Sequence, residues 1–140
     1  MIDLPGKRFN RSDIVSLFSS EFASIKDRFN IIELHMNYAE QDNSKEAAMP
    51  GVYVYLKDNK VWKVGRHLVN SRKRAIEHVN VKRTDYKVVN LKSDPEAVLL
   101  LFNLKEHAPK NGVDFRHWVA ALEIFFELRL DPLEKSDRLG

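Results

Sequence analysis

The sequence contains no cysteine and no long apolar run. Without cysteine the chain can form neither a disulfide bond nor a thiolate metal site, which is compatible with a reducing, cytoplasmic environment. No apolar stretch approaches the about 20 residues that cross a membrane, and the N-terminus lacks the apolar core of a signal peptide. Internal repeats and low-complexity tracts are also absent. We therefore expect a cytoplasmic protein that does not bind a membrane.

The composition is that of a globular protein with one local excess of positive charge. The 140 residues are 44% hydrophobic and 31% charged, enough for one compact domain with a core. The net charge of +3 is too small to indicate nucleic-acid binding by itself. Between Lys57 and Arg74, however, seven residues are basic and one is acidic. Such an excess is typical either of a solvated basic face or of a phosphate-binding surface.

The first 49 residues predict a helix followed by a strand. Apolar residues recur at helical spacing from Asp13 to about Phe29, which predicts an amphipathic helix capped by Asn10 or Ser12. From Ile32 to Tyr38 apolar and polar residues alternate, which predicts a half-buried strand. Since this unit is too small to fold alone, we expect residues 1–49 to be an extension packed on the same domain.

A β-hairpin and a short helix are predicted in the middle of the chain. Val52–Lys57 and Val61–Val64 are rich in β-branched and aromatic residues and flank the turn residues Asp58-Asn59. The helix that follows places Arg74 and His78, four positions apart, on one face. An arginine near a helix start opposes the helix dipole, and a bound anion would offset that cost.

The loop length of this hairpin determines which side chains share a face. A two-residue loop would put Lys63 on the opposite face from Tyr53. A three-residue loop, or a bulge, would pair Tyr53 with Gly65 and Tyr55 with Lys63, so that both tyrosines and the lysine share one face. We predict the three-residue loop or the bulge.

The second half of the chain contains one ambiguous segment and one clear helix. Val98–Phe102 is apolar enough to be either a short buried strand or part of a helix over Asp94–His107. From Arg116 to Leu130 the chain is apolar almost all round, which predicts a buried helix. Glu123 on this helix would need a partner, because an unpaired buried charge is costly. Glu127 is expected to be its exposed neighbour.

Cleavage of a phosphodiester bond requires a base, cations for the phosphate and usually a hard metal ion. Tyr53 is a candidate base if a cation such as Lys63 lowers its pKa. Arg74 offers a planar fork for phosphate oxygens, and His78 can transfer a proton near neutral pH. Glu123 is a candidate ligand for Mg²⁺ or Mn²⁺.

These residues, in this order and spacing, resemble the GIY-YIG endonuclease superfamily. Gly51-Val52-Tyr53 stands at the Gly-Ile-Tyr motif and Lys63-Val64-Gly65 at the Tyr-Ile-Gly motif. Asn70 to Arg74, followed by His78, is similar to the arginine helix of the family, and Ala121-Leu122-Glu123 before Pro132 is similar to its metal-binding helix. Two positions depart from the pattern. Lys63 replaces the second tyrosine, and Lys135 replaces an asparagine common after the terminal proline.

The resemblance implies an α/β (α+β) fold with a small, mainly antiparallel three-stranded sheet flanked by helices. The nuclease module would span residues 50–133, with a tail at 134–140. Its third strand is expected at Ala97–Leu104, leading to the helix of Glu123. In the rival interpretation Asp94–His107 is that helix, ends before Pro109 and offers no metal ligand.

The resemblance also implies a metal-dependent endonuclease that hydrolyses DNA phosphodiester bonds, with Mg²⁺ or Mn²⁺ as cofactor. The expected catalytic residues are Tyr53, Lys63, Arg74, His78 and Glu123. The expected phosphate- or DNA-binding residues are Tyr55, Arg66, His67, Arg72 and Lys73. The alternative is a catalytically inactive, GIY-YIG-like nucleic-acid-binding module. The expected partner is duplex or branched DNA. RNA as substrate, and a partner protein or a homodimer, remain open at this point.

Overall fold

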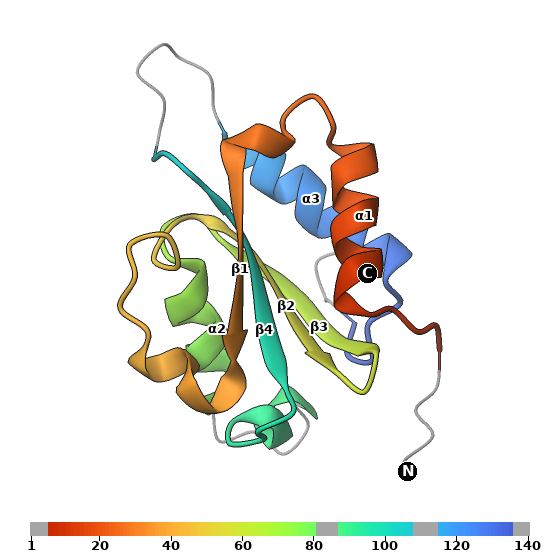
Figure 1. The fold of residues 1–140 in the computed structure, drawn as a ribbon, viewed down its shortest axis with the longest axis vertical. Helices are drawn as coiled ribbons and strands as arrows, with labels where there is room; N and C mark the ends of the chain where they lie inside the picture. Colours follow the sequence, from red (N-terminus) through yellow and green to blue (C-terminus); the bar gives the residue numbers. More distant parts are fainter. Residues whose placement is uncertain (1–5, 81–86, 108–114, 136–140) are drawn as a thin grey trace.

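Four antiparallel strands with helices on both faces make an α+β fold (Figure 1). The computed structural model describes residues 6–80, 87–107 and 115–135. In sheet order the strands are β1 (Phe29–His35), β4 (Val98–Leu104), β2 (Gly51–Lys57) and β3 (Lys60–His67). The helices are α1 (Arg11–Glu21), α2 (Ser71–Asn80) and α3 (Arg116–Arg129), with short 3-10 turns η1 (Lys26–Arg28), η2 (Met36–Gln41) and η3 (Lys87–Leu91). None of the described helices is long and apolar enough to span a membrane.

The predicted α+β class is confirmed, but the predicted three-stranded sheet is wrong. Strand β1, from the N-terminal extension, pairs with β4 along its whole length, from Phe29 opposite Leu104 to His35 opposite Val98. This makes four strands and places β4 between β1 and β2. The physical reason is that a strand as apolar as β4 has backbone groups to satisfy on both edges, and β1 supplies the second partner.

Strand β4 also resolves the ambiguous apolar segment. Val98–Leu104 is extended and paired on both sides, so the rival helix over Asp94–His107 is wrong. Successive side chains of β4 point to opposite faces, with Leu99 and Leu101 in one core and Leu100 in the other. Continuous apolar sequence is typical of a strand buried on both faces.

The predicted N-terminal helix is too long. Helix α1 ends at Glu21, and Phe29 begins β1 rather than ending the helix. The start was predictable, because Asn10 accepts a hydrogen bond from the Asp13 amide and Asp13 accepts one from the Asn10 amide, at 2.8 and 2.9 Å. The apolar spacing continues past α1 because the helix and β1 face the same core, where the Phe18 and Phe29 rings lie 5.5 Å apart.

The sheet separates two hydrophobic cores. Figure 1 shows α1 and α3 on one side of the sheet and α2 on the other. The α3-side core contains Ile14, Phe18, Val52, Val54, Phe102, Val119, Leu122 and Phe126. The α2-side core contains Tyr53, Tyr55, Leu99, Leu101, Ala75, Val79, Val88 and Leu91. Because β2 is buried on both faces, its alternating side chains supply both cores.

The hairpin of β2 and β3 has the predicted register, through a bulge. The turn has two residues, Asp58 and Asn59, both with φ of 56°, which is the left-handed region that such turns require. Tyr53 pairs with Gly65 and Tyr55 with Lys63, and the register shifts between Tyr55 and the next residue. The bulge, rather than a three-residue loop, places both tyrosines and Lys63 toward α2.

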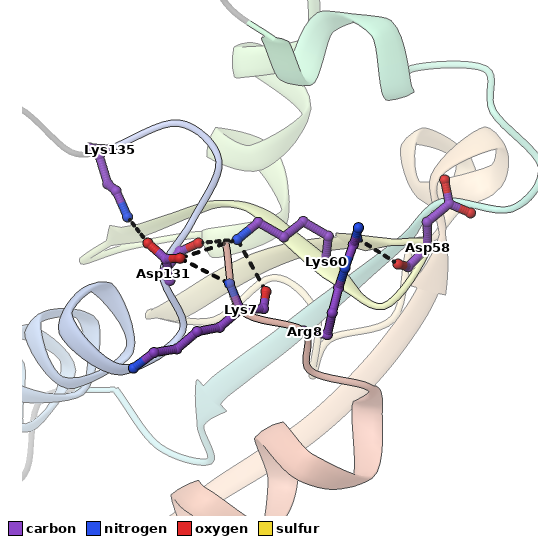
Figure 2. Close-up of polar contacts among 6 residues, drawn as sticks. All are labelled: Lys7, Arg8, Asp58, Lys60, Asp131 and Lys135. Carbon is purple, nitrogen blue, oxygen red and sulfur yellow. Dashed lines mark hydrogen bonds and ion pairs between the residues drawn. The ribbon is translucent and has the colours of Figure 1, made fainter. Parts of the chain in front are cut away.

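A buried lysine joins the hairpin to both the N-terminal segment and the segment after α3 (Figure 2). The Lys60 side chain is 1% exposed and donates hydrogen bonds to the carbonyl oxygens of Asp131, at 2.5 Å, and Lys7, at 3.2 Å. The Asp131 carboxylate accepts hydrogen bonds from the Lys7 amide, at 3.0 Å, and from Lys135, at 2.6 Å. Burial lowers the pKa of Lys60, so this amine needs the oxygens that surround it.

Candidate functional site

Tyr53 lies across the glycine opposite it on β3. A Cβ atom at position 65 would overlap with the Tyr53 ring, so the ring occupies the space above Gly65. The Tyr53 side chain leans over β3, the last strand in the sheet order, and is 1% exposed. The glycine of the predicted motif is therefore required here for a close approach of side chain to backbone.

His78 of α2 lies beside this tyrosine, with the two ring centroids 5.9 Å apart. The pKa of His78 is lowered from 6.5 to about 4, first by burial and then by the positive charges of Arg74 and Lys63. Glu134 acts in the opposite direction. At neutral pH the imidazole is therefore uncharged, and it binds a proton less readily than an ordinary histidine.

Lys63 forms a largely buried ion pair with Glu134. The Lys63 amine and a Glu134 carboxylate oxygen are 2.8 Å apart, and the side chains are 13% and 14% exposed. The other Glu134 oxygen accepts a hydrogen bond from the Lys87 amide at 2.8 Å. Sequence reasoning missed Glu134 and assigned it to the tail. A lysine on a buried strand signals that a carboxylate is needed, but the sequence does not say which one.

Tyr55 connects α2 to the sheet. Its hydroxyl donates a hydrogen bond to the Ala75 carbonyl at 2.6 Å, and its side chain is fully buried. Burial raises the pKa of Tyr55 well above its usual value, so the hydroxyl stays protonated. Tyr55 was predicted to bind phosphate, but its hydroxyl binds a backbone carbonyl of the protein instead.

Glu123 lies on the other face of the sheet from Tyr53. It forms an ion pair with Arg66, with 2.5 Å between nitrogen and oxygen, and its side chain is 5% exposed. Arg66 is paired with Val52, whose side chain lies in the α3-side core. Arg66 directly follows Gly65, and neighbouring residues of a strand point to opposite faces of the sheet. The ion pair of Arg66 with Glu123 and the ring of Tyr53 therefore lie on opposite faces. Glu127, expected to be exposed, is only 6% exposed.

The negative charge of Glu123 suits a magnesium ion, but Arg66 already competes for this carboxylate. Mg²⁺ in proteins commonly uses one or two carboxylates and completes its shell with water and phosphate oxygens. One Glu123 oxygen is already held by Arg66, so a cation has to share or replace the guanidinium. Within the described ranges no three His, Asp or Glu side chains converge as metal ligands. Glu123 is therefore the candidate ligand.

The residues between β3 and α2 form a tightly hydrogen-bonded turn. His67 accepts hydrogen bonds from the Asn70 and Val69 amides, at 3.0 and 3.3 Å. Asn70 caps α2 by accepting from the Lys73 amide at 3.0 Å. Arg72 donates to a carbonyl of η2, and Lys73 is exposed. His67 and Arg72 thus contact protein backbone, and Lys73 extends into solvent.

The basic stretch between Lys57 and Arg74 is largely neutralised within the fold. Five of its seven basic residues form ion pairs: Lys57 with Asp94, Lys60 with Asp131, Lys63 with Glu134, Arg66 with Glu123, and Arg74 with Glu77. All five partners lie outside the stretch. The local charge excess of the sequence is therefore not a bare basic surface, and a bound phosphate has to compete with carboxylates.

The predicted catalytic residues divide into two groups. Tyr53, Lys63, Arg74 and His78 belong to the α2 side of the hairpin, where Lys63 and Arg74 both act on the pKa of His78. Glu123 belongs to the α3 side. Comparison of the chain with protein-family models, curated proteins and solved structures found no match. The resemblance to GIY-YIG endonucleases stays a hypothesis.

Proposed function

We propose that the protein is an endonuclease that hydrolyses DNA phosphodiester bonds at the edge formed by β3 and α2. The observation that carries this proposal is the phenol ring of Tyr53 over Gly65, beside the uncharged imidazole of His78. The water oxygen attacks the phosphorus atom as the phosphorus–oxygen bond to the leaving group breaks. Tyr53 accepts a proton from the attacking water while its own hydroxyl proton passes to His78, and the leaving oxygen takes up a proton from solvent. Arg74, which is 42% exposed, binds and neutralises the phosphate oxygens.

The proposed cofactor is Mg²⁺ or Mn²⁺ on Glu123. When bound, the ion supplies positive charge for the phosphate oxygens and the leaving group. Because Glu123 and Tyr53 lie on opposite sides of β3, a substrate that uses both has to pass along the sheet edge at Gly65 and Arg66. The ion pair with Arg66 holds the Glu123 carboxylate in a fixed position before the substrate binds.

Nicking of a supercoiled plasmid tests the catalytic proposal. With Mg²⁺ or Mn²⁺ we expect wild type to nick, and EDTA to stop it. Tyr53→Phe and His78→Ala should each lower the rate by about 10² or more, the size expected for loss of acid–base catalysis. Tyr38→Phe is the matched control, because Tyr38 is 64% exposed. A wild type without nicking activity, or a Tyr53→Phe variant with full activity, would contradict the proposal.

The metal proposal has its own variant. Glu123→Gln keeps an oxygen for Arg66 and removes the charge that a metal ion needs. We expect this variant to lose nicking at all Mg²⁺ concentrations, while the exposed Glu96→Gln control retains it. If Glu123→Gln keeps full activity, Glu123 is not the metal ligand.

The second candidate function is a catalytically inactive module that binds nucleic acid. Two observations favour it: Tyr53 is 1% exposed, and Glu123 is held by Arg66. This function predicts DNA binding that weakens with salt and is indifferent to metal ions and to Tyr53→Phe. Fluorescence anisotropy with a short duplex, with and without Mg²⁺, distinguishes it from the endonuclease.

A further inference from the structure

Glu134 is held by the kind of donors that bind a phosphate oxyanion. Its carboxylate accepts one hydrogen bond from the Lys63 ammonium and one from the Lys87 amide, each at 2.8 Å. An ammonium together with a backbone amide is a common donor set for phosphate oxygens. The side chains of the pair are 13% and 14% exposed, so water competes little for these donors.

The segment that carries Glu134 is fixed along β3. The Leu133 amide donates to the Val61 carbonyl at 2.9 Å, and the Glu134 amide donates to the Trp62 carbonyl at 2.8 Å. Three residues earlier, Asp131 is held by the buried amine of Lys60 (Figure 2). The segment from Asp131 to Glu134 is thus held at both ends, and this fixes the Glu134 carboxylate against Lys63. The contact lies next to the bulge that turns Lys63 toward Tyr53.

Lys63 is paired with Glu134 and also acts on His78 of the proposed catalytic pair. Both the Lys63 ammonium and the Glu134 carboxylate influence the charge of His78, in opposite directions. Arg74 and Glu77 are the other charged groups that act on His78. A group that exchanges places with Glu134 would therefore change the electrostatics of the site without leaving the ammonium unpaired.

We propose that Glu134 is a positioning residue that occupies a phosphate-binding place on Lys63, so that a nucleic-acid phosphate competes with it for the ammonium. The nature of the ligand rests on the proposed function, but the competition needs no catalysis. It holds equally for an enzyme and for a module that only binds. The exchange of one oxyanion for another keeps Lys63 paired in both states.

Equilibrium binding in EDTA tests the competition. Glu134→Gln keeps an acceptor oxygen and removes the competing charge, so the affinity for a short DNA duplex should rise about tenfold. Lys63→Gln should lower the affinity, and the double variant should match Lys63→Gln. Glu96→Gln is the control, since Glu96 is exposed. In NMR titrations of Glu134→Gln the pKa of His78 should fall further, because Glu134 raises it.

The outcomes separate this inference from the proposed function. Unchanged or weaker DNA binding by a folded Glu134→Gln variant overturns the inference, even if wild type nicks plasmid. Tighter binding by that variant supports it, even if wild type does not nick. If Glu134→Gln does not fold, the wild type is titrated with inorganic phosphate. Shifts of the Glu134 carboxyl and Lys63 side-chain resonances then support the competition, and their absence rejects it.

Discussion

At the scale of single residues, Gly65 determines where Tyr53 lies. The ring fills the space of the missing side chain, so Gly65→Ala forces either the ring or the strand to move. We expect this substitution to lower the free energy of unfolding by about 1–3 kcal/mol, the usual cost of overpacking. Urea denaturation measures it. With Tyr53→Ala in the same chain the extra cost should vanish, and simple additivity of the two effects would contradict the contact.

His78 makes stability depend on pH. Its pKa is about 4 in the folded chain and 6.5 without the fold, so between these values the unfolded state binds more protons. Stability is therefore full above pH 6.5 and falls as the pH drops toward 4. Urea denaturation from pH 4 to 8 should show this loss for wild type, and a flatter profile for His78→Gln. The exposed His117→Gln control should behave like wild type.

The sequence could suggest Tyr53, Lys63 and His78 as neighbours, because a hairpin register and a helical spacing connect them. It could not show which of these side chains has its charge neutralised by a partner. Whether Lys63 is a bare cation depends on Glu134, which lies far along the chain and reaches Lys63 only through the path after α3. The same holds for Arg66 and Glu123. Ion pairs between distant residues are set by tertiary packing, which local patterns do not encode.

At the scale of elements, the segment after α3 depends on Asp131. Its pKa is lowered to about 2, first by the hydrogen bond from Lys135 and then by that from the Lys7 amide. The stabilisation is present above the ordinary pKa of 3.8 and is lost as the pH falls through about 2. Asp131→Ala should lower the free energy of unfolding at pH 7 and have little effect near pH 2. An equal loss at both pH values would contradict this role.

Local patterns predicted the hairpin, α2 and α3 well. Turn residues, β-branched runs and caps are local signals, and Asn70 and Asp58-Asn59 act as expected. The end of α1 was not predictable, because Phe29 continues the helical spacing from within a strand. The bulge in β3 was predicted from what Tyr53 and Lys63 need rather than from a signal of its own. Bulges depend on neighbouring chain segments, here Leu133 and Glu134.

At the scale of the whole molecule, β1 protects the edge of β4. Without residues 1–49, β4 would expose a row of unpaired backbone groups along an apolar strand, and its α3-side core would lose α1. We therefore expect a fragment of residues 50–135 to aggregate under conditions in which the full chain does not. Size-exclusion chromatography and light scattering measure this. A monomeric fragment that melts cooperatively near the temperature of the full chain would contradict it.

The sheet order also constrains when the protein can fold during synthesis. The β2–β3 hairpin closes a two-residue turn and can form on the microsecond scale once His67 has been made. Strand β4 lies between β1 and β2 but is translated after both, so β1 waits without a strand partner until Leu104 has left the ribosome. The slow step is then the insertion of β4 between two strands that are already present, a long-range event that we expect to limit the folding rate.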